Sequence, residues 1–287
     1  MDEIENMKNW FNSFINDDNK LKLTIVCRWY AYHFDTYINS IYRKQIYPRM
    51  KLINHANLLH DEENHSFWTD SLETTFKNNF CDKKYIESPF HMFIGKSPVL
   101  LSKFITQINE LTFVMDKIFI RSNLYYSINQ SIKVYRGLII PKGNTLLLDI
   151  KGLTSLTTNI DTAEQFAFTI YGNEDDGEPI LYDERKYDSY IIEFELLENT
   201  LVIPMNICTI QDEDELILIS QGILEQLNVK EEKIICWNSY INLEGKIIDP
   251  NEGELTYTKI KARFINDYKL PEYGEFKISD ISVIDDL

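Results

Sequence analysis

The residues best suited to chemistry are two glutamates in an acidic run that leads into an apolar segment. Glu213 and Glu215 stand two positions apart in 211–219, which reads QDEDELILI. Side chains alternate in an extended chain, so both carboxylates are expected on one face while Asp212 and Asp214 face away. Paired carboxylates can stabilise positive charge and accept a proton. The alternative interpretation is a solvated turn that keeps a strand edge from pairing.

An arginine within a β-branched and aromatic run is the next candidate. Residues 134–138 read VYRGL, so Arg136 is followed directly by Gly137. A guanidinium donates paired hydrogen bonds to oxyanions and stays ionised when partly buried. A glycine lets other groups approach the backbone closely. A single arginine in a strand is also a common structural ion-pair partner, so this motif indicates a binding site only in combination with other motifs.

Hydroxyl side chains form the third candidate, in 153–157, which reads LTSLT. A hydroxyl such as that of Ser155 can donate to a carboxylate oxygen and fix its rotamer. Ala163, Phe166 and Ala167 follow at helical spacing. The alternative interpretation is that Ser155 and Thr157 end a strand and cap the next helix, and that Phe166 belongs to the helix core.

Taken in this order, the three segments resemble the signature of mono-ADP-ribosyltransferases of the Arg-Ser-Glu class, which include toxins. The resemblance covers roughly 100–260, and Gly222 and Leu224 are similar to the family's strand-Gly-strand continuation. Ser155 and Thr157 match the first and last residues of the family's Ser-Thr-Ser strand. Leu156 replaces the central threonine, so the hydrogen bonding of that side chain is not carried over.

The resemblance implies that NAD is a substrate, held without a Rossmann glycine motif. Loss of nicotinamide leaves an oxocarbenium-like ribose, which the carboxylate of Glu215 would stabilise. Glu213 would orient an acceptor guanidinium and take its proton, and a glutamate at this position implies arginine as the acceptor. The implied catalytic residues are Glu215, Glu213, Ser155 and Arg136, and the implied NAD-binding residues are Arg136, Gly137, Ser155, Thr157, Phe166 and Glu215.

The pattern of apolar residues predicts an α+β fold. Residues 1–122 read mainly helical, and the GKSP stretch at 95–98 suggests a boundary between a helical N-terminal region, 1–98, and a catalytic core, 99–287. Strands are expected at 133–138, 145–150, 190–196, 215–220, 234–237 and 254–260, a helix at 161–168 and a loop at 172–183. The resemblance implies that the core is split into two sheets with the NAD cleft between them.

Composition and charge restrict the partners, metal sites and cellular location that are expected for the protein. The 287 residues carry a formal net charge of −16, which disfavours nucleic acid. His55, His60 and His65 recur at five-residue spacing, which does not align side chains on one helical face, so no metal site is expected. Four scattered cysteines predict buried thiols in a reducing compartment. Without an apolar run or signal peptide, a cytoplasmic location is expected, which leaves delivery into a host cell open.

Three other functions compete with protein ADP-ribosylation. An NAD glycohydrolase would use the same residues with water in place of the protein acceptor. An interaction protein could keep the NAD-binding fold without turnover, for which Leu156 is the one hint. An acidic binding module would make all three motifs accidental.

Overall fold

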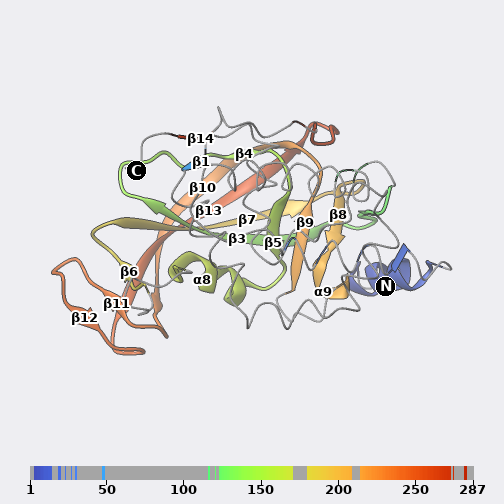
Figure 1. Ribbon diagram of the computed structural model, residues 1–287. Coiled ribbons are helices and arrows are strands. Elements are labelled where there is room, and N and C mark those ends of the chain that lie inside the picture. Colours follow the sequence, from blue (N-terminus) through green and yellow to red (C-terminus); the bar gives the residue numbers. More distant parts are fainter. Residues whose placement is uncertain are drawn as a thin grey trace, which may run out of the picture.

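The computed structural model describes residues 3–14, 19, 20, 23, 27, 30, 47, 48, 116, 120, 123–170, 180–208, 214–272, 274, 281 and 282. Within them a strand-rich body is flanked by short helices (Figure 1). The helices are α1 (Glu3–Asn12), α8 (Ile160–Phe168) and α9 (Met205–Cys208). The strands are β1 (Tyr47–Pro48), β2 (Tyr126–Ser127), β3 (Ile132–Pro141), β4 (Asp149–Ile150), β5 (Thr154–Thr157), β6 (Tyr182–Asp183), β7 (Tyr187–Leu196), β8 (Leu201–Pro204), β9 (Glu215–Leu218), β10 (Gly222–Ile235), β11 (Tyr240–Ile241), β12 (Ile247–Ile248), β13 (Glu254–Asn266) and β14 (Ile281–Ser282).

Nine of these strands form one sheet in the order β2-β8-β9-β5-β3-β7-β13-β10-β4. The long strands β3, β7, β13 and β10 pair along much of their length, whereas β5 joins β3 through a single residue pair, Tyr135 and Thr157. The sheet therefore consists of a short-strand part, β2-β8-β9-β5, and a long-strand part, β3-β7-β13-β10-β4, joined at one point. This division agrees in part with the predicted two-sheet core.

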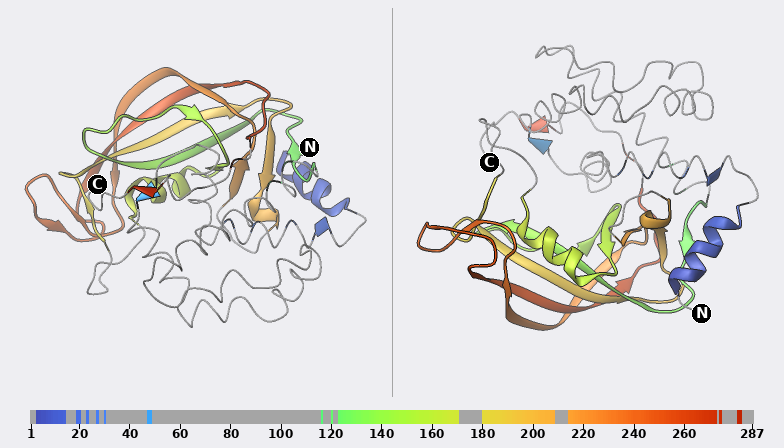
Figure 2. Two further views of the ribbon diagram at one scale, coloured as in Figure 1. Left: turned by 45° about the horizontal axis from the view of Figure 1, so that its top comes forward. Right: turned by 90° about the horizontal axis from the view of Figure 1, so that it is seen from below.

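Alternation along the strands separates two apolar clusters. One face contributes Val134, Leu156, Ile192, Leu216 and Phe264 to the larger cluster. The opposite face of the long strands packs against α8 in a second cluster, which includes Ala163, Ala167, Ile191, Leu255 and Tyr257. Both faces of the long-strand part are thus buried in places, and α8 can be seen lying along one of them in the two views of Figure 2.

Helix α1 packs on the short-strand part although it lies more than a hundred residues away in sequence. Its Met7 is buried in the larger cluster, and the ring of Trp10 meets that of Tyr126 edge-on at 5.8 Å. Buried Glu3 accepts hydrogen bonds from the hydroxyl of Tyr126 at 2.8 Å and from the amide of Asn129 at 2.7 Å. Burial and the bond to Glu3 raise the pKa of Tyr126 to about 12.

Helix α8 spans Ile160–Phe168, beginning one residue before the predicted helix 161–168 and ending where that helix was predicted to end. The side chain of Asn159 caps the N-terminus by accepting from the amide of Asp161 at 2.9 Å. Alanines at positions 163 and 167 face the sheet, where Gly137 of β3 leaves room for the helix backbone. A Cβ at Gly137 would lie 2.8 Å from the amide nitrogen of Ala167 and closer still to the carbonyl oxygen of Ala163. Ser189 of β7 also donates to the carbonyl of Ala167 at 2.6 Å.

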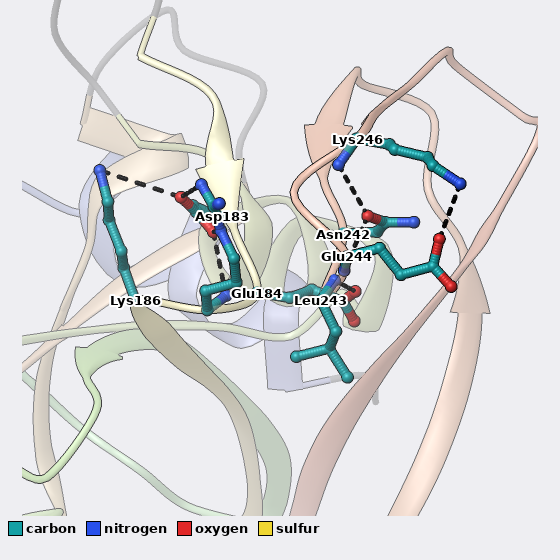
Figure 3. Close-up of polar contacts among 8 residues, drawn as sticks. Asp183, Glu184, Lys186, Asn242, Leu243, Glu244 and Lys246 are labelled. Atoms are coloured by element: carbon teal, nitrogen blue, oxygen red, sulfur yellow. Dashed lines mark hydrogen bonds and ion pairs between the residues drawn. The ribbon is translucent and has the colours of Figure 1, made fainter.

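A separate three-stranded sheet, β12-β11-β6, projects from the body at the lower left of Figure 1. Its base is held by Asp183, whose buried carboxylate accepts from the guanidinium of Arg185 at 2.9 and 2.8 Å. These bonds hold the pKa of Asp183 at about 2. Glu184 accepts from the amide of Leu243 at 3.2 Å and so ties the β11–β12 turn to β6 (Figure 3).

Several predicted element boundaries are wrong. Only Asp149–Ile150 of the predicted strand 145–150 is extended and paired, because 144–148 has no continuous partner strand. The strand expected at 234–237 begins at Gly222, since β13 pairs with it along the whole length of β10. The predicted loop 172–183 ends in β6, because Tyr182 and Asp183 pair with β11. The division at residue 98 stays a prediction.

Candidate active site

The three sequence motifs lie on adjacent strands, β9, β5 and β3. Thr157 of β5 is directly paired with Glu215 of β9 on one side and with Tyr135 of β3 on the other. Directly paired residues project from the same face of a sheet. Glu215, Thr157 and Tyr135 therefore form a row across the junction between the two parts of the sheet.

Ser155 occupies the same face of β5 as Thr157, two residues earlier. It is half-buried and pairs with Ile217 of β9, which is fully buried. Buried Tyr30 donates its hydroxyl to the carbonyl of Leu153 at 3.4 Å, so the N-terminal region contacts the start of this strand. Register places Ser155 beside the strand that begins at Glu215, and its role in orienting that carboxylate stays a prediction.

The chain turns sharply just before Glu215. Asp214 has a φ of 48°, in the left-handed region, and its carbonyl accepts from the amide of Thr158 at 3.3 Å. The hydroxyl of Thr157 accepts from the amide of Asn159 at 3.1 Å. One set of bonds thus ties together the end of β5, the start of β9 and the cap of α8.

The predicted alternation between Glu213 and Glu215 assumes an extended backbone at Asp214, whereas the φ of Asp214 is left-handed. Glu213 lies outside the described residues, so its place beside Glu215 stays a prediction.

Arg136 and Gly137 lie next to the junction on β3. The β3–β7 register is continuous, so Arg136 shares its face with Val134 and Leu138, opposite to Tyr135. Gly137 faces α8, where its missing side chain admits the helix backbone. The structure thus gives Gly137 a packing role that the sequence argument did not include. Contact of either residue with NAD stays a prediction.

Phe166 lies on α8, half-buried, one residue before Ala167, which packs on β3. Burial raises the pKa of the neighbouring helix residue Glu164, and the carboxylate of Asp161 raises it further. Lys259 of β13 lowers the same pKa and Glu232 of β10 raises it.

Sequence reasoning missed a chain of ion pairs that crosses the long strands on this face. Its ammonium and carboxylate groups alternate as Lys133, Glu193, Lys259, Glu232 and Lys230, with separations of 3.4 Å, 3.8 Å and 3.6 Å along the first four. Lys230 contacts Glu232 at the far end, and Tyr257 donates to Glu232 at 2.8 Å. The available sequence signal was alternating charge at two-residue spacing in β10, which reads equally as a solvated edge.

Other expectations concern metals, membranes and thiols. Among the residues with described positions, no three His, Cys, Asp or Glu side chains are grouped to hold a metal ion, and no helix is long and apolar enough to cross a membrane. Cys27 and Cys236 are buried, as predicted, and burial raises the pKa of Cys236. His55, His60 and His65 lie outside the described part of the chain.

Comparison with known proteins finds similarity among solved structures. No family model matches the chain, and no curated protein does. Vis toxin, an ADP-ribosyltransferase from Vibrio splendidus, is 10% identical, with 82% of this chain and 94% of that chain covered at a TM-score of 0.35. Plx2a, an ADP-ribosyltransferase toxin from Paenibacillus larvae, is 14% identical, with 77% and 98% covered at 0.30. The enzymatic component C2-I of the Clostridium botulinum C2 toxin is 12% identical, with 79% and 46% covered at 0.28.

Proposed function

We propose that the protein is an NAD-dependent mono-ADP-ribosyltransferase that transfers ADP-ribose to a protein side chain, with arginine as the acceptor. One observation carries the proposal. The Arg-Gly, Ser-x-Thr and Glu segments, which are separated in sequence, lie on the adjacent strands β3, β5 and β9, with Thr157 paired to both Tyr135 and Glu215. Similarity to the solved toxins is too distant to add to this argument.

The proposed chemistry begins with loss of nicotinamide from NAD. Positive charge then spreads over the ribose, and a carboxylate at Glu215 stabilises it and holds the 2'-hydroxyl. Ser155, on the same face of the neighbouring strand, orients that carboxylate by donating to it. This hydrogen bond fixes the side-chain rotamer of Glu215 before the bond between nicotinamide and ribose breaks.

Binding of NAD is assigned to residues near the junction between the two parts of the sheet. Arg136, which projects from the face opposite to Glu215, would donate to phosphate and ribose oxygens across the junction. Phe166 would stack near nicotinamide, and Gly137 and Thr157 would line the face that carries Glu215. Glu213 would orient the acceptor guanidinium and take its proton, because a guanidinium is a poor nucleophile while it is charged.

The test compares three purified proteins with labelled NAD and an arginine-rich acceptor protein: the natural chain, Glu215→Gln and Glu213→Gln. Label on protein and free nicotinamide are both measured. Glu215→Gln is expected to lose both products by about a thousandfold or more, because the charge-stabilising group is removed. Glu213→Gln is expected to lose labelled protein about a hundredfold while nicotinamide release largely persists.

The matched control is Glu225→Gln, which removes an exposed carboxylate of β10 that faces Arg263 at 3.6 Å and should keep full activity. Nicotinamide release without labelled protein in the natural chain would assign NAD glycohydrolysis instead. NAD binding without either product would assign an interaction protein, and no binding would refute the proposal. Equal residual transfer in the two glutamine variants would refute the division of roles.

A further inference from the structure

Two connections between the parts of the nine-stranded sheet run side by side. Residues 151–153 lead from β4, which pairs with β10, into β5, and residues 219–221 lead from β9 into β10. The side chain of Gln221 bridges these connections. Its carboxamide oxygen accepts from the amide of Gly152 at 2.7 Å, and its carboxamide nitrogen donates to the carbonyl of Gly152 at 3.1 Å. The same nitrogen donates to the carbonyl of Ile219 at 2.8 Å.

The bonds of Gln221 continue the short ladder between β5 and β9. Thr154 is paired with Leu218, so Gly152 would stand opposite Ser220 two places further along both strands. The amide of Ser220 donates to β8 instead. The carboxamide of Gln221 carries a donor and an acceptor, as a peptide group does, and it exchanges both bonds with Gly152 as a neighbouring strand would.

Gln221 is itself held through its backbone. Its amide donates to the carbonyl of Lys269 at 3.1 Å, and its carbonyl accepts from the amide of Asp267 at 3.0 Å, both in the segment that follows β13. Gly152 is buried and has a φ of 72°, which glycine adopts without strain. A side chain whose backbone is bonded at two points, and whose own bonds all go to backbone groups, is a fixed support.

Strand β5 is consequently fastened at both ends. At its C-terminal end the bonds are those around Thr157, which reach β9 and the cap of α8. At its start they are the bonds of Gln221, together with the longer bond from Tyr30 to Leu153 at 3.4 Å. Ser155 lies between these fastenings. A strand of four residues has few ladder bonds of its own, so the loss of support at its start allows it to fray.

We propose that Gln221 is a positioning residue that holds β5 against β9, and through β5 holds the hydroxyl of Ser155 beside the carboxylate of Glu215. The proposal rests on the proposed function for its catalytic consequence. Gln221 follows the end of β9 opposite to Glu215. It therefore acts through the ladder and is assigned no contact with substrate.

The test uses the full-length protein and measures the ladder and the chemistry separately. Gln221→Met removes all three side-chain bonds at nearly constant length, and Gln226→Met makes the same exchange at an exposed position of β10 as the matched control. Ser155→Ala, alone and combined with Gln221→Met, completes a double-mutant cycle. Backbone amide hydrogen exchange is followed in β5 and β9 and, for reference, in β7 and β13. Nicotinamide release from NAD gives KM and kcat.

Exchange in β5 and β9 is expected to be about tenfold faster in Gln221→Met, with β7 and β13 unchanged. We expect kcat to fall about fivefold with KM within about twofold, because Ser155 acts on the carboxylate that stabilises the transition state. In the Ser155→Ala background the further loss should be less than about twofold, since the hydroxyl that Gln221 positions is already absent. Gln226→Met is expected to change none of these measurements.

Unchanged exchange in β5 and β9 would overturn the positioning role, as would equal acceleration in β7 and β13. An undiminished loss of kcat in the Ser155→Ala background would overturn the action through Ser155. If Gln221→Met does not fold, Gln221→Glu is the second variant. It keeps the acceptor for Gly152, lacks both donors, and should also accelerate exchange in β5 and β9 alone. A natural chain without NAD turnover whose β5 and β9 exchange still responds to Gln221→Met would refute the proposed function and leave the support of β5 standing.

Discussion

The two parts of the nine-stranded sheet differ in the length of their strands and in how extensively those strands pair. In the long-strand part, β3, β7, β13 and β10 pair over many residues, and α8 covers one of its faces. In the short-strand part, β5, β8 and β9 have four residues each, and the join to β3 is one residue pair. The candidate carboxylate Glu215 lies at the first residue of β9, beside that join.

The candidate carboxylate thus lies beside the extensively paired part of the sheet without belonging to it. Long paired strands resist deformation because many hydrogen bonds and apolar contacts must be broken together. A few hydrogen bonds can set the direction of a short strand that begins after a residue with a left-handed backbone. Here those bonds come from Thr157, Thr158 and Asn159, which join β5, β9 and α8.

Gly137→Ala is expected to cause the largest loss of stability, because it acts where α8 meets the long strands. The added methyl group would overlap the helix backbone at Ala163 and Ala167, which cannot move as a side chain would. We expect unfolding in urea to show a loss of about 3 kcal/mol or more. Gly143→Ala is the contrast, because nothing lies near its Cβ although its φ is 87°, and it should cost about 1 kcal/mol.

Both variants of this pair are measured by their urea midpoints at a constant m-value. A Gly137→Ala protein as stable as Gly143→Ala would mean that α8 does not rest on β3 at this point.

Asp183→Asn tests a part of the molecule outside the comparison, the three-stranded sheet at the base of α8. Arg185 holds the pKa of Asp183 at about 2, below its ordinary value of 3.8. A depressed carboxyl pKa stabilises the folded protein above about pH 4, and this contribution is lost as the pH falls from about 4 to 2. We expect the variant to lose about 1–2 kcal/mol at neutral pH, because half of Arg185 remains in solvent and screens the pair.

The measurement is the free energy of unfolding in urea at several pH values between about 7 and 3. The difference between the natural chain and Asp183→Asn should shrink as the pH falls. Asp149→Asn, which removes a half-exposed carboxylate 3.0 Å from Lys151, should show little difference at any pH. A pH-independent gap for Asp183→Asn would assign its effect to packing and not to charge.

Much of the strand-rich body could be predicted from the sequence because its patterns are local. Alternation and β-branched residues located β3, β7 and β9, and the helical spacing of Ala163, Phe166 and Ala167 located α8. The order of the motifs predicted that their segments would lie close together, and β9, β5 and β3 are adjacent strands, although Arg136 projects from the face opposite to Glu215.

What could not be predicted depends on contacts between distant residues. The bond from Tyr126 to Glu3 spans 123 positions, and nothing in the local sequence of either residue indicates it. The length of β10 follows from its pairing with β13, since a charged segment such as 228–233 reads as a loop when taken alone. The close approach of α8 that requires Gly137 is likewise visible only in three dimensions.

The left-handed backbone at Asp214 offers the smallest and sharpest test of the short-strand part. A β-branched residue is disfavoured at a φ of 48°, whereas glycine adopts it freely. Asp214→Val and Asp214→Gly both remove the carboxylate, so the difference between them isolates the backbone. We expect Asp214→Val to be less stable than Asp214→Gly by about 1 kcal/mol in urea unfolding.

The activities of the two variants separate an effect on stability from an effect on the direction of the Glu215 side chain. If the turn at Asp214 directs Glu215, Asp214→Val should release nicotinamide about tenfold more slowly than Asp214→Gly even where both are fully folded. Equal rates would mean that the direction of Glu215 is set by its pairing with Thr157 and not by the turn. The short-strand part would then resemble the long-strand part in deriving its geometry from the ladder, and the contrast between them would reduce to strand length.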